Sequence, residues 1–369
     1  MNILMIVTWY TPKGAPMVSD GVFHYEQAME LQRRGCNVAL YFPFDGQQDH
    51  FTGEREWGLM TYRTGTGSNR TLRILRDFRR IRKEFRPDIM HAQVAGGAGY
   101  VAMGLSRLYR IPYLITEHNP LEMYDMKNPK VRKRVAQAYH HSKKNICVSP
   151  DAMEKMQKAF PGEQFEVIYN GTLNPEAVTL TGEKYTVEGR VNCCIIAAFY
   201  NETVKGYQYL LPAIRKLKDK KYPIMLHIVG GGEYLGKYQD MAAELDIEDC
   251  CIFYGSCSRE KVYSILSQMD FSISASVIES AGVSVQEAML LGKPLVVTRS
   301  GGASSVATPE AAILVDRESV DALADGIAAM IHSYGNYRSD KIKAYAYENF
   351  EMGQVTERYL RLYRRILEQ

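Results

Sequence analysis

The chain alternates short, apolar, β-rich runs with helix-like patterns almost from end to end. Its first elements are an expected strand at Ile3–Thr8, a helix at Phe23–Arg34 and a strand at Val38–Phe42. The same alternation resumes at Cys193–Phe199 and continues to Val320–His332. Strands that are separated by helices pair in parallel, and the helices then cover both faces of the sheet. We therefore expect an α/β fold built from doubly wound parallel sheets.

The alternation is interrupted once, between Leu173 and Arg190, by a polar stretch punctuated with Pro and Gly. A chain of 369 residues has the length of about two domains. Near the C-terminus, aromatic residues and leucines recur at helical spacing from Met352 to Leu367. The expected divisions are a Rossmann-like domain at 1–172, a linker at 173–190, a second Rossmann-like domain at 191–345, and a helical segment at 346–369 that crosses back to the first domain.

Composition excludes several classes of protein. Apolar residues make up 46% of the chain and charged residues 24%, which is typical of globular proteins and excludes disorder. The longest apolar runs, such as Cys193–Tyr200, are far shorter than the roughly 20 residues of a membrane-spanning helix. The run at Met1–Val7 has the pattern of a strand and lacks that of an export signal. The seven cysteines show no C-x-x-C spacing, so we expect reduced thiols and a cytoplasmic protein.

Positive charge is concentrated in the first half of the chain. Up to Thr172 there are 24 lysines and arginines against 17 acidic residues, and after it 21 against 25. Cations between Arg70 and Arg86 surround an apolar stripe at helical spacing, and more cations follow from Lys127 to Lys144. They form either a solvated surface or a patch that rests on anionic lipid at the inner face of the membrane. Nucleic acid is a poorer partner, because no aromatic-rich binding motif interleaves these charges.

Two carboxylates follow the expected strand Phe271–Ala275. Glu279 lies in the loop, and Glu287, eight positions later, lies in an otherwise apolar helix. A buried carboxylate needs hydrogen-bond donors, which the vicinal hydroxyls of a ribose would supply. The helix dipole alone also explains an acidic residue at the position of Glu279, so the pair could be structural. The backbone N–H groups from Ala281 to Ser284 form an anion site at the helix start.

A lysine precedes the next candidate helix. Lys205 and Gly206 lie between the strand Cys193–Phe199 and a helix that begins at Tyr207. A lysine at a helix N-terminus opposes the helix dipole, so its placement indicates an anion nearby, for which a phosphate is suitable. The alternative is an ordinary solvated lysine in a loop.

Polar side chains also follow the expected strand Tyr113–Thr116 in the first half of the chain. The carboxyl ends of parallel strands form the ligand-binding edge of an open sheet, so these side chains are candidates for substrate contacts. For the histidines, a place in the core is the alternative. A long loop rich in Gly and Pro follows the first strand and could bring backbone N–H groups to a ligand. The candidates in this half are Glu117, His118, Asn119, His91 and Gly21.

An ordered series of short motifs runs along the chain. They are Gly21 in the first loop, Pro87-Asp88-Ile89-Met90-His91-Ala92, Thr116-Glu117-His118, Val148-Ser149, Val167-Ile168-Tyr169-Asn170-Gly171, Lys205-Gly206, Ile228-Val229-Gly230, Glu279-x7-Glu287, Gly292-Lys293-Pro294 and Gly301-Gly302. In this order they resemble the retaining glycosyltransferases of family 4, whose GT-B fold has two Rossmann-like domains facing a central cleft. The likeness covers nearly the whole chain.

The resemblance implies a hexosyltransferase that takes its sugar from a nucleotide-diphosphate sugar, most often a uridine diphosphate (UDP) sugar. The acceptor would be a glycan or a lipid-linked molecule in surface polysaccharide or glycolipid synthesis, in a protein that is cytoplasmic or peripheral on the inner membrane face. No cofactor is expected, and no metal, since the sequence has no Asp-x-Asp motif at a strand end. A front-side substitution without a covalent intermediate is expected by the same analogy.

The resemblance also assigns roles to individual residues. Lys205 would bind the donor diphosphate, helped by the turn amides at Gly282 and Val283. The sugar hydroxyls would bind Glu279. The remaining assignments place the ribose at Glu287, the phosphate near Gly21, the base near Gly230 and Tyr254, the reacting carbon near His118, and the acceptor near Glu117, Asn119 and His91. His118, Lys205 and Glu279 are the expected catalytic residues.

The chain departs from the family pattern at several positions. Tyr200 stands where an arginine is common five residues before the lysine, and Ser305 stands where a glutamate is common. The first loop has Asp20-Gly21 in place of two glycines, and Glu279-Ser-Ala-Gly282 replaces Glu-Gly-Phe-Gly. These departures keep open a non-catalytic GT-B subunit that binds a nucleotide or a partner without turnover, beside a mannosyltransferase that uses guanosine diphosphate (GDP) mannose. A nicotinamide dehydrogenase is disfavoured, because no G-x-G-x-x-G follows the first strand.

Overall fold

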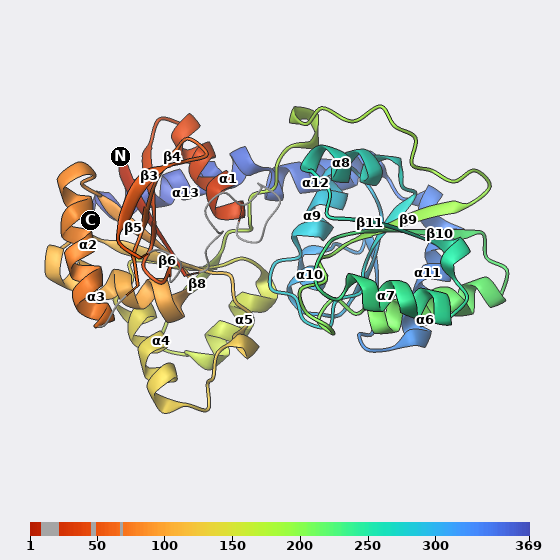
Figure 1. The fold of residues 1–369 in the computed structure, drawn as a ribbon, viewed down its shortest axis with the longest axis horizontal. Coiled ribbons are helices and arrows are strands. Elements are labelled where there is room, and N and C mark those ends of the chain that lie inside the picture. The colour runs from red at the N-terminus through yellow and green to blue at the C-terminus, as the bar shows by residue number, and fades with distance from the viewer. Residues whose placement is uncertain (9–21, 46–48, 67–68) are drawn as a thin grey trace. The chain divides into compact units, whose positions relative to one another are not determined.

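The computed structural model describes residues 1–8, 22–45, 49–66 and 69–369, and the chain divides into two compact units (Figure 1). Unit 1 contains Met1–Gly171 and Met352–Gln369, and unit 2 contains Thr172–Glu351. The segment expected to be a linker therefore lies inside unit 2. The return of the chain to unit 1 begins at Met352, six residues later than expected from the sequence.

Unit 1 is built on an eight-stranded sheet in the order β3-β4-β2-β1-β5-β6-β7-β8. Neighbouring strands are parallel, except that β3 pairs antiparallel with β4. The strand order reverses at β1, which lies between β2 and β5. Open α/β sheets bind ligands outside the carboxyl ends of the strands at such a reversal. The strands are β1 (Asn2–Val7), β2 (Asn37–Phe42), β3 (Thr52–Glu56), β4 (Leu59–Arg63), β5 (Ile89–Gln93), β6 (Tyr113–Glu117), β7 (Asn145–Cys147) and β8 (Phe165–Val167).

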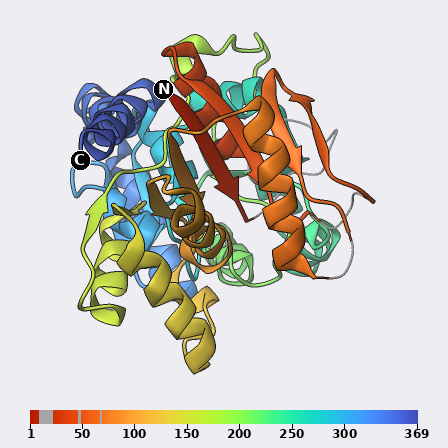
Figure 2. The same ribbon diagram turned by 90° about the vertical axis from the view of Figure 1, so that its left-hand side faces the viewer.

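Helices cover both faces of this sheet, as the turned view shows (Figure 2). Successive side chains of a strand point to opposite faces. Leu4 and Ile6 of β1 accordingly share a core with Phe78 of α2, whereas Ile3 shares another with Tyr363 of α13. The helices are α1 (Val22–Arg33), α2 (Arg70–Glu84), α3 (Tyr100–Tyr109), α4 (Pro129–His141), α5 (Pro150–Ala159) and α13 (Met352–Leu367), with a π-helical turn at Val94–Gly99 and a 3-10 turn at Leu121–Met123.

Unit 2 has a six-stranded, wholly parallel sheet in the order β11-β10-β9-β12-β13-β14. Its strand order reverses at β9, which lies between β10 and β12. The ligand-binding edge of this unit is therefore expected where the loops after β9 and β12 meet. The strands are β9 (Val191–Ile196), β10 (Ile224–Val229), β11 (Cys251–Gly255), β12 (Phe271–Ser274), β13 (Leu295–Thr298) and β14 (Ala312–Val315).

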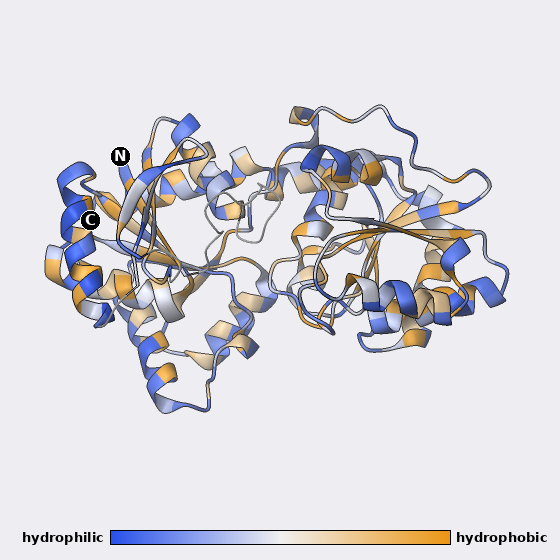
Figure 3. Cartoon of the chain, viewed as in Figure 1, coloured by the Kyte–Doolittle hydropathy of each residue, from blue (hydrophilic) through white to orange (hydrophobic). Residues whose placement is uncertain are grey.

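The strands of unit 2 are apolar and its outer helices have one polar side (Figure 3). Leu210, Tyr238 and Ile327, from three different helices, pack into one core with the sheet. Both units thus confirm the expected α/β fold class. No helix in the described ranges is long and apolar enough to span a membrane. The helices are α6 (Tyr207–Asp219), α7 (Leu235–Glu244), α8 (Arg259–Gln268), α9 (Val283–Leu290), α10 (Gly302–Val306), α11 (Val320–Ser333) and α12 (Ser339–Phe350), with 3-10 turns at Pro175–Ala177, Glu248–Cys250 and Tyr334–Asn336.

Candidate functional site

The loops that follow β9 and β12 meet at the carboxyl edge of the unit 2 sheet. The Val277 N–H donates a hydrogen bond of 2.8 Å to the Val204 carbonyl. Gly206 has a φ of 73°, and a Cβ there would lie 1.9 Å from the Ala275 carbonyl oxygen. Only glycine allows this backbone conformation and this close approach together. The backbone therefore holds Lys205 next to the loop that follows β12.

Lys205 forms an ion pair with Glu279 across this junction. The Lys205 Nζ lies 2.8 Å from a carboxylate oxygen of Glu279, and the two side chains are 30% and 20% exposed. The backbone fixes Glu279, because its N–H donates to the Ser300 carbonyl at 2.9 Å and its carbonyl accepts from the Gly302 N–H at 2.6 Å. The anion that offsets Lys205 at the start of α6 is thus a carboxylate. The expected anion near Lys205 is therefore present, and a phosphate contact at Lys205 stays a prediction.

A second glycine starts α9 beside the Glu279 loop. Gly282 has a φ of 70°, and a Cβ there would lie 2.6 Å from the Ala303 Cα. Gly282 precedes Val283, the first residue of the helix, and the N–H groups of Val285 and Gln286 bond back to the Gly282 carbonyl. The first turn of a helix presents backbone N–H groups and the positive end of the helix dipole. Gly282 and Val283 therefore stand at a position suited to an anion.

Glu287 is buried, as expected from its apolar neighbours, with 6% of its side chain exposed. It forms an ion pair with Arg259, at the first position of α8. Sequence reasoning did not identify Arg259 as this partner. A buried carboxylate signals that some donor is present, but the sequence does not tell which of the cations supplies it. A carboxylate can accept about four hydrogen bonds, so one arginine does not by itself exhaust it.

Gly230 and Tyr254 end neighbouring strands of unit 2. A Cβ on Gly230 would lie 2.1 Å from the Ala197 carbonyl oxygen, so the backbone passes very close to the end of β9. The Tyr254 hydroxyl lies 2.9 Å from Nδ1 of the buried His227. Burial lowers the pKa of His227 to about 4, so this imidazole is neutral at pH 7. The Lys261 amine lies 5.7 Å from the centroid of the Tyr254 ring. A contact between Tyr254 and the nucleotide base stays a prediction.

His118 lies at the carboxyl edge of the unit 1 sheet, just after β6. Its Nε2 is 2.7 Å from the Gln93 amide oxygen at the end of β5, and its ring packs near the rings of Phe23 and His24. Because an amide oxygen accepts, this bond assigns the His118 proton to Nε2 and leaves Nδ1 as an acceptor. Burial lowers the pKa of His118 to about 3, so the ring is neutral across the physiological range.

Glu117 has an internal role that the sequence did not predict. It is fully buried and accepts hydrogen bonds from the Tyr124 and Tyr139 hydroxyls at 2.7 and 2.6 Å, and from the N–H groups of Ala95 and Asn119. These four donors occupy the buried carboxylate in place of the expected acceptor contact, and they join the end of β6 to the π-helical turn, to α4 and to the segment that contains Tyr124. In contrast, the Asn119 side-chain oxygen is buried without a hydrogen-bond partner among the described residues, which suits a ligand contact.

His91 lies in the core, which corrects its assignment to the acceptor side. Its Nδ1 is 2.7 Å from the Tyr363 hydroxyl of α13, and its Nε2 is 2.7 Å from Oγ1 of Thr116. The Tyr363 partner lies 272 positions away, so no local pattern reveals it. Gly21 lies outside the described residues. Within those residues, no three His, Cys, Asp or Glu side chains gather closely enough to hold a metal ion.

Comparison with known proteins agrees with the geometry of both units. The glycosyl transferases group 1 model matches residues 194–349, and the Glycosyltransferase Family 4 model matches residues 21–172. An uncharacterized glycosyltransferase of Methanocaldococcus jannaschii is 23% identical over 287 residues, which is 73% of each chain. The alpha-monoglucosyldiacylglycerol synthase of Streptococcus pneumoniae is 22% identical over 251 residues, 58% of this chain and 53% of that one.

A solved structure supports the fold. The Anabaena protein HepE in complex with UDP aligns over 99% of this chain and 100% of its own, with a TM-score of 0.76 and 16% identity. With two family models that together span most of the chain, and with this similarity of fold, the protein is a GT-B glycosyltransferase that belongs to family 4.

Proposed function

We propose that the protein transfers a hexose from a UDP-sugar to a lipid-linked or glycan acceptor, with retention of the anomeric configuration. The observation that carries this proposal is the Lys205–Glu279 pair at the strand-order reversal of unit 2. Lys205 lies in the loop that leads into α6, and Glu279 lies in the loop that leads into α9. The bond between the anomeric carbon and the diphosphate breaks, and its electron pair stays on the diphosphate. The acceptor oxygen forms the new bond, and its proton passes to the leaving phosphate oxygen.

Lys205 is proposed to neutralise the negative charge that develops on the leaving diphosphate. The backbone N–H groups at Gly282 and Val283 would add the field of the α9 N-terminus. Glu279 would bind hydroxyls of the donor sugar, and Glu287 the ribose hydroxyls. Since a cation and a helix start supply the charge compensation, the proposed mechanism uses no metal ion.

His118 is proposed to bind a hydroxyl near the reacting carbon through Nδ1. A neutral imidazole whose pKa lies near 3 accepts a hydrogen bond but is a weak base at pH 7. It would therefore orient a hydroxyl group and leave the acceptor proton to the phosphate oxygen. Asn119, with its buried side-chain oxygen, is placed in the same region of unit 1.

The choice of donor and acceptor is supported by the relatives. The HepE structure contains UDP, and the streptococcal relative is named for glycolipid synthesis. We further propose that unit 1 approaches an anionic membrane surface. The Phe78 and Ile81 side chains of α2 are buried in the core, whereas Arg76, Arg79 and Arg80 are exposed. Sedimentation with vesicles should rise with anionic lipid content, and sedimentation that is independent of this content contradicts a membrane contact.

Calorimetric titration with UDP, GDP, ADP and CDP in the presence of EDTA tests the proposed donor. UDP is expected to bind without a divalent cation, and the other three nucleotides more weakly. Preferential binding of GDP would favour a mannosyltransferase. Absence of binding by all four would favour the non-catalytic subunit, and would make Tyr200→Arg the first variant to examine.

A further inference from the structure

Unit 1 contains a groove of about 520 Å³ beside the carboxyl ends of β1 and β5. This volume lies in the range of about 300–1,000 Å³ that is usual for small-molecule sites. Its walls are formed by α2, by α3 and by the π-helical turn, and most of the lining is apolar. The apolar side chains that line it are Phe44, Ile74, Leu75, Tyr100, Val101 and Leu105.

Two arginines lie at the groove over aromatic rings. The Arg70 guanidinium is 5.4 Å from the Phe44 ring centroid, and the Arg134 guanidinium is 5.4 Å from the Tyr100 ring centroid. Within the described residues, neither arginine forms an ion pair or a hydrogen bond. Arg70 is also the first residue of α2, whose first turn contains no acidic side chain, so its charge opposes the helix dipole. Both positive charges would be stabilised by an anion in the groove.

The groove adjoins His118 through Thr8. Thr8 lines the groove, and its hydroxyl accepts a hydrogen bond of 2.8 Å from the Ala98 N–H. The same hydroxyl lies 3.5 Å from the carbonyl oxygen of Gln93, the residue whose side chain holds His118. Thr8 and Gln93 thus connect the groove to His118 within unit 1, and a ligand that extends beyond Thr8 would approach His118.

We propose that this groove binds a phosphate-bearing lipid acceptor, with the apolar chain along α2 and α3 and the phosphate at Arg70 and Arg134. An apolar lining beside two uncompensated cations is complementary to an anionic amphiphile. A free glycan would leave the apolar lining unused, and a neutral lipid would leave both arginines without an anion. The inference rests on the proposed function, because it names the acceptor class of that reaction.

Alkyl phosphates of different length, used below their micelle-forming concentration, test the apolar part of the groove. Decyl phosphate should bind about tenfold more tightly than octyl phosphate, which is the effect expected for two buried methylenes. Gly104 lies in α3 and lines the groove, and a Cβ there would meet no atom within 4 Å. Gly104→Leu should fold normally, fill the groove and abolish the dependence on chain length. Gly236→Leu in α7, where a Cβ also has open space, is the matched control and should keep it.

Arginine variants test the charged part. Arg70→Gln and Arg134→Gln should each weaken decyl phosphate binding about fivefold. Arg79→Gln on α2 and Arg132→Gln on α4 remove exposed charges outside the groove and should change it less than twofold. Equal losses in the controls would show a general effect of surface charge and refute the groove, as would an unchanged chain-length dependence in Gly104→Leu.

UDP titration separates this inference from the proposed function. A protein that binds UDP but shows no saturable alkyl phosphate binding contradicts only the acceptor site. A protein that binds decyl phosphate in the groove but no nucleotide contradicts the transferase, and retains an amphiphile site. Inorganic phosphate at the same concentration should not displace decyl phosphate, because it lacks the apolar chain.

Discussion

Replacing Glu279 with glutamine is expected to raise the affinity of the protein for UDP. The Glu279 carboxylate lies 2.8 Å from the Lys205 amine, so under the proposed function it would compete with the donor diphosphate for this amine. Because these side chains are 20% and 30% exposed, the pair is partly screened, and such pairs contribute at most about 1 kcal/mol. Removing the carboxylate charge should therefore lower the dissociation constant of UDP by up to about fivefold.

The gain should depend on Lys205. A hydrogen bond to a charged group contributes about 1.5–3 kcal/mol, so Lys205→Met is expected to weaken UDP binding by about 10- to 100-fold. In the Lys205→Met background, Glu279→Gln should give no gain, because the competition has been removed. Calorimetry of the four proteins measures this double-mutant cycle, and the gain should shrink in 0.5 M salt as the charges are screened.

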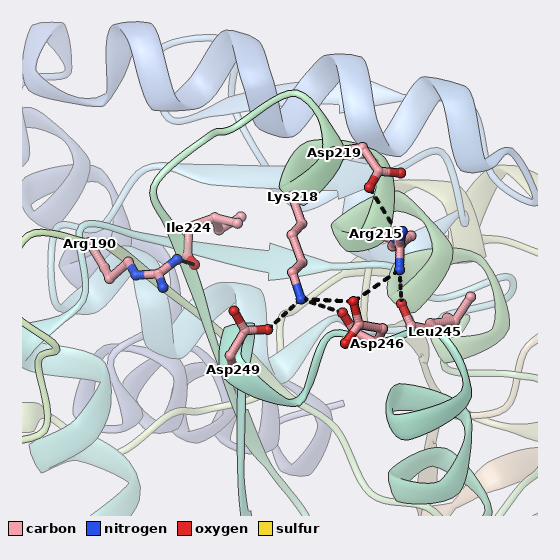
Figure 4. Close-up of polar contacts among 8 residues, drawn as sticks. All are labelled: Arg190, Arg215, Lys218, Asp219, Ile224, Leu245, Asp246 and Asp249. Atoms are coloured by element: carbon pink, nitrogen blue, oxygen red, sulfur yellow. Dashed lines mark hydrogen bonds and ion pairs between the residues drawn. The ribbon is translucent and has the colours of Figure 1, made fainter.

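The chain offers a matched control at the other end of α6. The Lys218 amine lies 2.8 Å from Asp249 and also bonds to Asp246, and its side chain is 27% exposed (Figure 4). It is thus similar to Lys205 in pairing and exposure, but a helix of 13 residues separates them by about 20 Å. Lys218→Met should leave UDP binding unchanged. An equal loss in both lysine variants, or a Glu279→Gln gain that persists without Lys205, refutes the reasoning.

Three further predictions follow from the buried groups and the close contacts. His118→Ala should leave UDP binding unchanged and lower the transfer rate at least tenfold. Because His118 stays neutral, the ratio of the two transfer rates should not change between pH 5 and 8. An unchanged transfer rate would remove His118 from the site. Burial lowers the pKa of His91 to about 3, so below pH 6.5 only the unfolded chain gains its proton, and stability is lost as the pH falls. His91 should therefore cost unit 1 about 2 kcal/mol between pH 7 and 5. In urea unfolding, His91→Gln should lose about 2 kcal/mol less than the parent over this range, while His118 keeps its own contribution. Gly206→Ala places a Cβ 1.9 Å from the Ala275 carbonyl oxygen and should both lower the melting temperature and abolish UDP binding, whereas intact UDP binding would show that the junction can adjust.

Periodicity predicted the fold class because it follows directly from burial. In β1, Leu4 and Ile6 face one core and Ile3 faces the other, so a strand buried on both sides reads as a continuous apolar run. The boundaries between units were less predictable. Residues 173–190 are polar and lack periodicity, but they belong to unit 2, where the Asn192 side chain accepts a hydrogen bond from the Val187 N–H.

The candidate site was predictable where the backbone itself creates it. Gly206 and Gly282 occupy conformations and contacts that require glycine, and they flank the residues predicted to bind the donor. The partners of buried charges were not predictable. Glu117 accepts from Ala95 and Tyr139, each 22 positions away, and Glu287 pairs with Arg259, and a single sequence does not reveal these contacts between separate elements. Which side chains touch substrate therefore stays a prediction.

The return of the chain to unit 1 has a consequence for biosynthesis. Helix α13 contributes Val355, Tyr359 and Tyr363 to the core that also contains Ile3 and Met5 of β1. During translation, the second face of β1 is not fully covered until α13 has been made. Unit 2 is continuous in sequence and can complete its core before α13 is made, so unit 1 finishes folding after unit 2 although most of it is synthesised first. A chain truncated before Met352 should therefore keep part of the apolar face of β1 exposed, and chaperones should retain it.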